Sequence, residues 1–172
     1  MKKMALFSLT GLLLLGAVGT SSAEVVNRIG GGVNYWTKLG KIDSQDVSQE
    51  GLSWLVTYQM KFMPLVRVEL DGELLPSKFG GAVNDVLAPQ AYVIVGYGLY
   101  AAAGVGIYYD THDGFADKPF YALRAGVDFP IFILPLRLDL GLSYRFEEWN
   151  KLDGVDINRD TFVIGAAVRV EL

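Results

Sequence analysis

The amino-acid sequence predicts an all-β fold, namely an eight-stranded antiparallel up-and-down β-barrel. Apolar and polar residues alternate with period two in almost every segment that follows residue 23. This alternation places successive side chains on opposite faces of a strand. Eight such segments follow one another, and the connections between them are alternately short and long. An even number of strands joined in this way is typical of a small closed barrel.

The chain begins with a pattern typical of a secretory signal peptide. Two lysines are followed by a largely apolar stretch from Ala5 to Val18 and by small residues that end at Ala23. Such segments are cleaved during export, and this apolar stretch is too short for a comfortable membrane span. We therefore expect residues 1–23 to be a signal peptide and residues 24–172 to form one barrel domain.

The alternating segments have about the length of a tilted strand that crosses a bilayer, which is roughly 9 to 11 residues. The clearest example runs from Leu136 to Glu147, where leucine, tyrosine and phenylalanine alternate with arginine, aspartate, serine and glutamate. The expected strands are residues 26–36, 51–61, 65–75, 90–97, 99–110, 120–129, 135–147 and 160–171.

The connections provide a second line of evidence. Three are short, at residues 62–64, 98 and 130–134. Outer-membrane barrels have tight periplasmic turns and longer outer loops, so this asymmetry predicts that both chain ends lie on the periplasmic side. Four connections are long and mostly polar: Thr37–Glu50, Pro76–Pro89, Thr111–Pro119 and Glu148–Arg159.

The composition of the less apolar face indicates whether this face lines the barrel interior or contacts solvent on the outside. A soluble lipocalin-like barrel would also alternate, with an apolar core and a polar exterior. Here, however, that face carries small residues such as Gly104 and Gly106, which suit a crowded interior better than a solvated surface. Its charges have both signs, and paired charges can occupy a narrow lumen whereas an unpaired buried charge costs several kcal/mol. The predicted lumen charge network comprises Arg67, Glu69, Asp71, Glu73, Arg124, Asp128, Arg137, Asp139, Arg145, Glu147, Arg169 and Glu171. We therefore predict a transmembrane barrel, with a soluble periplasmic lipocalin-like carrier as the alternative.

Aromatic residues gather toward the expected strand ends, among them Trp36, Trp54, Tyr92, Phe120 and Phe129. Rings with a polar tip favour the boundary between membrane and water, so we expect two aromatic girdles. The general preference of aromatic residues for strands explains many of these positions equally well.

The domain resembles the OmpA/OmpX-like superfamily of small outer-membrane β-barrels in its architecture, its signal peptide and its C-terminal strand. Members of this class end in a strand with alternate apolar residues, usually with a terminal phenylalanine, that the barrel-assembly machinery reads. Val168, Val170 and Leu172 match the spacing, with leucine in place of the usual aromatic residue. The resemblance implies location in the bacterial outer membrane, contact with its lipids and lipopolysaccharide, and assembly by that machinery.

No catalytic residues are expected. Lipid A deacylases of this shape use a His-x-Ser pair, but the single histidine, His112, has Gly114 at the second position after it. Palmitoyl-transferring barrels use His, Asp and Ser near the outer rim, and no spacing links His112 and Asp113 to a loop serine such as Ser48 or Ser77. We expect the protein not to be an enzyme, with a lipid A-modifying barrel as the exception that the sequence leaves open.

No cofactor or metal is assigned either. The stretch from Asp153 to Asp160 carries oxygen ligands on alternate residues but lacks the glutamate that closes a calcium loop, and whether it binds a cation stays open. Gly30–Gly32 and the pair Gly96 and Gly98 resemble phosphate loops only superficially, because no helix follows them. The net charge of −4 argues against a nucleic-acid partner, and the absence of cysteine excludes disulfides.

The sequence thus favours an integral barrel with a structural or surface-interaction role through its four long outer loops. A narrow gated pore is the second hypothesis, since eight strands leave room for little more than side chains. A lipid-modifying enzyme or an apolar ligand carrier comes last. No pattern indicates the surface partner.

Overall fold

The computed structural model describes residues 25–38, 50–77, 84–110, 112, 114–131, 135–147 and 161–172. The expected signal peptide, residues 1–23, and the acidic stretch from Asp153 to Asp160 lie outside the described residues.

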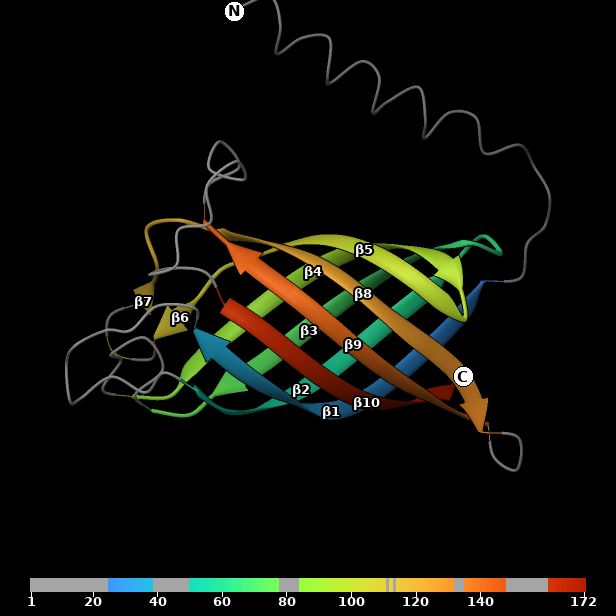
Figure 1. Ribbon diagram of the computed structural model, residues 1–172, viewed down its shortest axis with the longest axis horizontal. Coiled ribbons are helices and arrows are strands. Elements are labelled where there is room, and N and C mark those ends of the chain that lie inside the picture. The colour runs from blue at the N-terminus through green and yellow to red at the C-terminus, as the bar shows by residue number, and fades with distance from the viewer. Residues whose placement is uncertain are drawn as a thin grey trace, which may run out of the picture.

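Eight long strands form a closed antiparallel barrel (Figure 1). Each barrel strand pairs with the next along the chain, and β1 pairs with β10 in the register Gly31 to Val168, which closes the barrel. The described residues contain no helix. The predicted all-β barrel is therefore confirmed. Its strands are β1 (Val26–Lys38), β2 (Glu50–Lys61), β3 (Val66–Leu75), β4 (Val86–Tyr97), β5 (Leu99–Gly106), β8 (Phe120–Ile131), β9 (Leu136–Phe146) and β10 (Thr161–Glu171).

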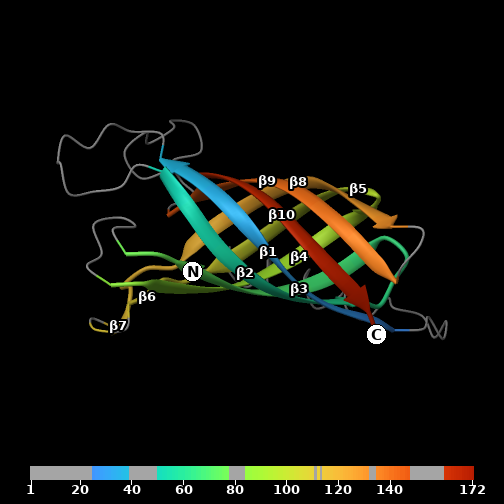
Figure 2. The same ribbon diagram turned by 90° about the horizontal axis from the view of Figure 1, so that it is seen from below.

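The strands are inclined to the long axis of the barrel, and β1 starts at the end where β10 finishes (Figures 1 and 2). We call this the turn end, because β2, β4 and β8, each followed by a short connection, finish there. The opposite end, where β1, β3, β5 and β9 finish, is the loop end, because the strand ends that the longer connections join lie there.

Two strands differ from the sequence prediction by more than two residues at one end. The expected strand 99–110 is divided into β5 and the short β6 (Tyr109–Asp110), which pairs with β7 (Gly114–Phe115) in a small hairpin at the loop end. The strand expected to begin at residue 90 begins instead at Val86 and contains Pro89. Proline is tolerated there because Pro89 lies beside the break between β5 and β6, and its carbonyl accepts a hydrogen bond from the Ile107 N–H at 3.1 Å.

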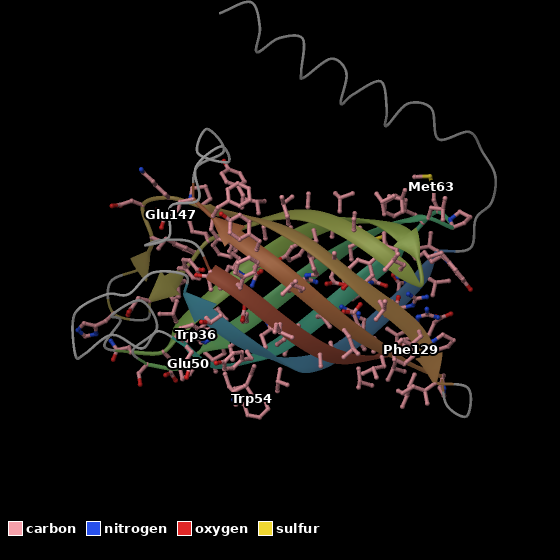
Figure 3. The ribbon with its side chains drawn as sticks, in the orientation of Figure 1. Trp36, Glu50, Trp54, Met63, Phe129 and Glu147 are labelled. Atoms are coloured by element: carbon pink, nitrogen blue, oxygen red, sulfur yellow. The ribbon has the colours of Figure 1, made fainter. Side chains whose placement is uncertain are left out.

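The two faces of each strand differ sharply, and β2 shows how. Leu52, Trp54 and Val56 point outward and are 63%, 69% and 65% exposed, whereas Thr57 and Gln59 point inward and are fully buried. The apolar face is thus the outer one, the reverse of a water-soluble barrel. In Figure 3 Trp54 points away from the barrel wall. Among the described residues no helix has the length and apolar character needed to cross a membrane.

Candidate functional site: the charged lumen

The interior of the barrel is filled by charged side chains from many strands. Period-two alternation turns every second residue inward, and on several strands these residues are ionisable. Burial of a charge is costly unless it is paired and hydrogen-bonded, so the partners of each group decide whether the interior is stable. The charged side chains gather in three clusters between the turn end and the loop end.

The cluster nearest the turn end is centred on Asp128 of β8, which is 1% exposed. Its carboxylate contacts three guanidinium groups: Arg28 of β1 at 3.4 Å, Arg137 of β9 at 2.7 Å, and Arg67 of β3. Arg28 also forms an ion pair at 3.0 Å with Glu171, which is partly exposed at the end of β10. One aspartate thereby connects four strands.

The middle cluster contains two arginines that share a carboxylate. Arg124 of β8 contacts Glu69 at 2.6 Å and Asp71 at 2.9 Å, both on β3. Arg169 of β10 contacts the other oxygen of Glu69 at 2.8 Å and Asp139 of β9 at 2.9 Å. The Arg124 guanidinium also lies 3.9 Å from the centre of the Tyr92 ring, within the range of a cation–π contact.

The third cluster surrounds Glu73 of β3 on the loop side. Glu73 forms an ion pair with Arg145 of β9 and accepts hydrogen bonds from the side chains of Asn34 at 2.9 Å, Gln90 at 2.8 Å and Ser53. Both carboxylate oxygens therefore have several donors, as a buried carboxylate requires.

Ten of the twelve residues proposed from the sequence lie buried or half-buried within these clusters, and each of the ten has an ion-pair partner within 4 Å. The other two lie at the barrel ends. Glu171 is exposed at the turn end, and Glu147 follows the last residue of β9 at the loop end, where Figure 3 labels it.

Sequence reasoning missed Arg28 and the uncharged members of the network. Arg28 shares its face of β1 with Gly30, Gly32, Asn34 and Trp36, so the same period-two pattern would have found it. The uncharged members gave no comparable signal, because serine, threonine, asparagine and glutamine are common on solvated faces as well. With Arg28 and Glu171 the described clusters hold six arginines and six carboxylates.

An apolar layer closes the lumen on the loop side of the charged clusters. Tyr108, between β5 and β6, stacks on Phe120 of this layer with 4.5 Å between ring centres. Burial raises the pKa of the Tyr108 phenol to about 12. The layer consists of Trp36, Leu75, Val86, Ala88, Phe120 and Val163.

The girdle interpretation was wrong for Trp36, Tyr92 and Phe120, which are 1–2% exposed inside the barrel. Trp54 and Phe129, in contrast, are exposed on the outside. These three rings fit inside because each lies opposite a glycine of a neighbouring strand: Trp36 opposite Gly51, Tyr92 opposite Gly104 and Phe120 opposite Gly106.

The remaining sequence candidates do not form a site in the described residues. His112 is exposed at the loop end, and no group of three metal-ligating side chains is found in the described ranges. Gly30–Gly32 lie within β1, paired on both sides, and Gly98 has a φ of +76° in the tight turn between β4 and β5. The proposed assembly residues Val168, Val170 and Leu172 are all exposed on the outer face.

A closed antiparallel barrel of eight strands, with an apolar exterior and side chains filling its interior, has the architecture of the small outer-membrane β-barrels of the OmpA/OmpX-like type. The solved structure of Neisserial surface protein A has this fold. It aligns with 86% of this chain and 96% of its own, with a TM-score of 0.54 and 16% sequence identity. At that identity the likeness shows the fold alone.

Two weaker structural matches were also found. One is a de novo designed transmembrane β-barrel, with a TM-score of 0.43, 11% identity and coverage of 89% of this chain and 98% of the design. The other is Ail, the attachment invasion locus protein of Yersinia pestis, with a TM-score of 0.41, 13% identity and coverage of 86% and 97%. No conclusion is drawn from either. No family model and no curated protein matches the sequence.

Proposed function

We propose that the protein is an integral barrel of the bacterial outer membrane that anchors its four loop-end connections at the cell surface, where they contact other molecules. The observation that carries this proposal is the reversal of the faces. Leucine, valine and tryptophan side chains cover the outside of the wall while arginines and carboxylates fill the inside. Water would penalise such an exterior, whereas the lipid chains of a bilayer accept it.

The filled lumen favours an anchor over a pore. Three charged clusters and one apolar layer occupy successive levels of the interior. The passage of a solute would require ion pairs at each level to separate, and separated buried charges are expensive. The barrel therefore serves as a rigid support, and the connections that it holds are the working surface.

The asymmetry of the connections supports an orientation with the loop end outside the cell and the turn end, with both chain ends, in the periplasm. In this orientation the outer wall contacts membrane lipids and lipopolysaccharide. Val168, Val170 and Leu172 at the turn end would be the residues that the barrel-assembly machinery reads from the periplasm.

Labelling of introduced cysteines in intact cells tests this placement, because the chain has no cysteine of its own. Lys118→Cys lies at the loop end and Pro64→Cys in a turn at the other end, and both side chains are exposed. A membrane-impermeant maleimide is expected to label Lys118→Cys on intact cells and Pro64→Cys only after the outer membrane is permeabilised. The opposite result would invert the orientation, and equal labelling of both in the soluble periplasmic fraction would contradict membrane insertion.

A further inference from the structure

A small cavity lies in the lumen, beside the middle cluster and against the wall formed by β9 and β10. Its volume is about 20 Å³. Gly141, Gly165 and Ala167 leave the space open, since they place little or no side chain on that part of the wall. Val163 of the apolar layer also lines the cavity, which therefore lies directly beside that layer. The polar side chains around it are Asn34, Arg124, Asp139, Ser143, Arg145 and Arg169.

Arg145 lines this cavity and carries hydrogen-bond donors that have no acceptor among the described residues. The side chain is 3% exposed and pairs with Glu73 through Nη2. Among the described residues no atom accepts a hydrogen bond from its Nε or Nη1. The Arg145 Cζ lies 5.3 Å from the centre of the Phe120 ring, but the N–H groups of a guanidinium point within its plane and still need an acceptor.

The surrounding charge selects a neutral occupant. Three arginines line the cavity, and their ion-pair partners are four carboxylates: Glu69, Asp71, Glu73 and Asp139. An anion would add to a region that already holds more negative than positive charge. Water can accept from a guanidinium and donate to a carboxylate, and one molecule needs roughly 10–15 Å³ of such space and two to four polar partners.

We propose that this cavity is a binding site for one ordered water molecule, which accepts a hydrogen bond from Arg145 and donates to oxygen atoms on the β9 wall. The charged lumen is then a network of side chains and water rather than of side chains alone. The site goes beyond the anchoring role and does not depend on the identity of any surface partner.

The test is a rotating-frame NMR experiment on the full barrel in detergent micelles, in which direct contact with water and proton exchange give signals of opposite sign. Comparison with the Arg145→Lys variant assigns the Arg145 Nε–H resonance. We expect a direct-contact signal between water and this proton. Arg67 serves as an internal control, because its Nε also has no acceptor in the described residues but it does not line the cavity.

Gly141→Ala tests the site at a second β9 residue that lines the cavity. The added methyl group would lie 3.1 Å from the Tyr100 hydroxyl and 3.4 Å from Arg124 Cδ, so it fits with a small adjustment and occupies the cavity. We expect the water signal at Arg145 to fall at least tenfold in this variant and to persist in Gly72→Ala, where an added methyl meets nothing within 4 Å. No direct-contact signal at Arg145 in the unaltered barrel would overturn the proposal. So would a bromide ion in the cavity of crystals grown in bromide, because the site would then take an anion.

Discussion

Asp128 illustrates at the residue scale how the barrel tolerates a charged interior. The side chain lies on β8, yet its three arginine partners come from β1, β3 and β9. Arg28 and Arg67 are 100 and 61 residues away from Asp128 in the sequence, so these two ion pairs form only when the barrel brings their strands together. Buried ion pairs add little net stability compared with an apolar core, but breaking one leaves a charge without a partner.

Replacement of Asp128 by asparagine should accordingly be severe. The Asp128→Asn variant keeps the shape of the side chain but leaves Arg28, Arg67 and Arg137 without their shared negative charge. We expect the free energy of unfolding to fall by about 3–5 kcal/mol. The measurement is equilibrium unfolding by guanidinium chloride in lipid vesicles, followed by tryptophan fluorescence.

Asp117→Asn is the matched control, because Asp117 is exposed in the loop-end connection. A surface substitution of this kind usually changes stability by less than about 0.5 kcal/mol. If the two variants unfold at the same denaturant concentration, the Asp128 cluster does not stabilise the barrel.

The strands themselves show a second regularity, in which four of the large rings inside the barrel lie opposite glycines. Tyr92 faces Gly104, Tyr100 faces Gly126 and Phe120 faces Gly106 across neighbouring strands. Glycine leaves space over the backbone of its strand, and the ring of the neighbour lies across it. This pairing lets aromatic side chains fit into an eight-stranded lumen.

Gly104→Ala tests the pairing, because a Cβ atom at this position would overlap the Tyr92 ring. We expect a loss of about 1–3 kcal/mol in unfolding free energy, since overpacking forces the ring to move. The same unfolding measurement on Gly72→Ala, which is also in a strand but free of contacts, should show no loss. Equal loss in both variants would mean that strand propensity, and not the ring, determines the effect.

The local pattern was sufficient to predict most of the strands and the inward position of ten of the twelve charged residues, because period two is a property of each strand alone. Leu136 to Phe146 is an example, where the predicted and observed strands differ by about one residue at each end. The inward position of Trp36 was not predicted, since it depends on Gly51 of the neighbouring strand. Pro89 was predicted to end a loop, but it lies within β4. The break between β5 and β6 that accommodates it belongs to the neighbouring chain segment, so the residues around Pro89 gave no sign of it. The contacts of Asp128 with Arg28 of β1 and Arg67 of β3 join strands that are not neighbours of β8 in the barrel, and no single segment encodes them.

At the scale of the whole molecule, the filled interior favours the role of an anchor over that of a conducting pore. We expect no regular conductance steps when the barrel is reconstituted in a planar bilayer, because charged clusters and the apolar layer close it at several levels. Trp36→Ala should also remain closed, since it removes part of the apolar layer but none of the ion pairs. Regular steps in the unaltered protein would favour the gated-pore hypothesis instead.

The most direct test of the central claim, that the apolar face of the wall contacts lipid, is tryptophan quenching by lipids brominated on their acyl chains. The chain has three tryptophans, so the double variant Trp36→Phe with Trp149→Phe leaves only Trp54, which is 69% exposed on the outer face. In vesicles, brominated lipid should quench Trp54 strongly and aqueous acrylamide weakly. A barrel that keeps only Trp36 should respond weakly to both quenchers, because that ring is buried in the lumen. Quenching of Trp54 by acrylamide but not by brominated lipid would place this face in water and contradict the membrane barrel.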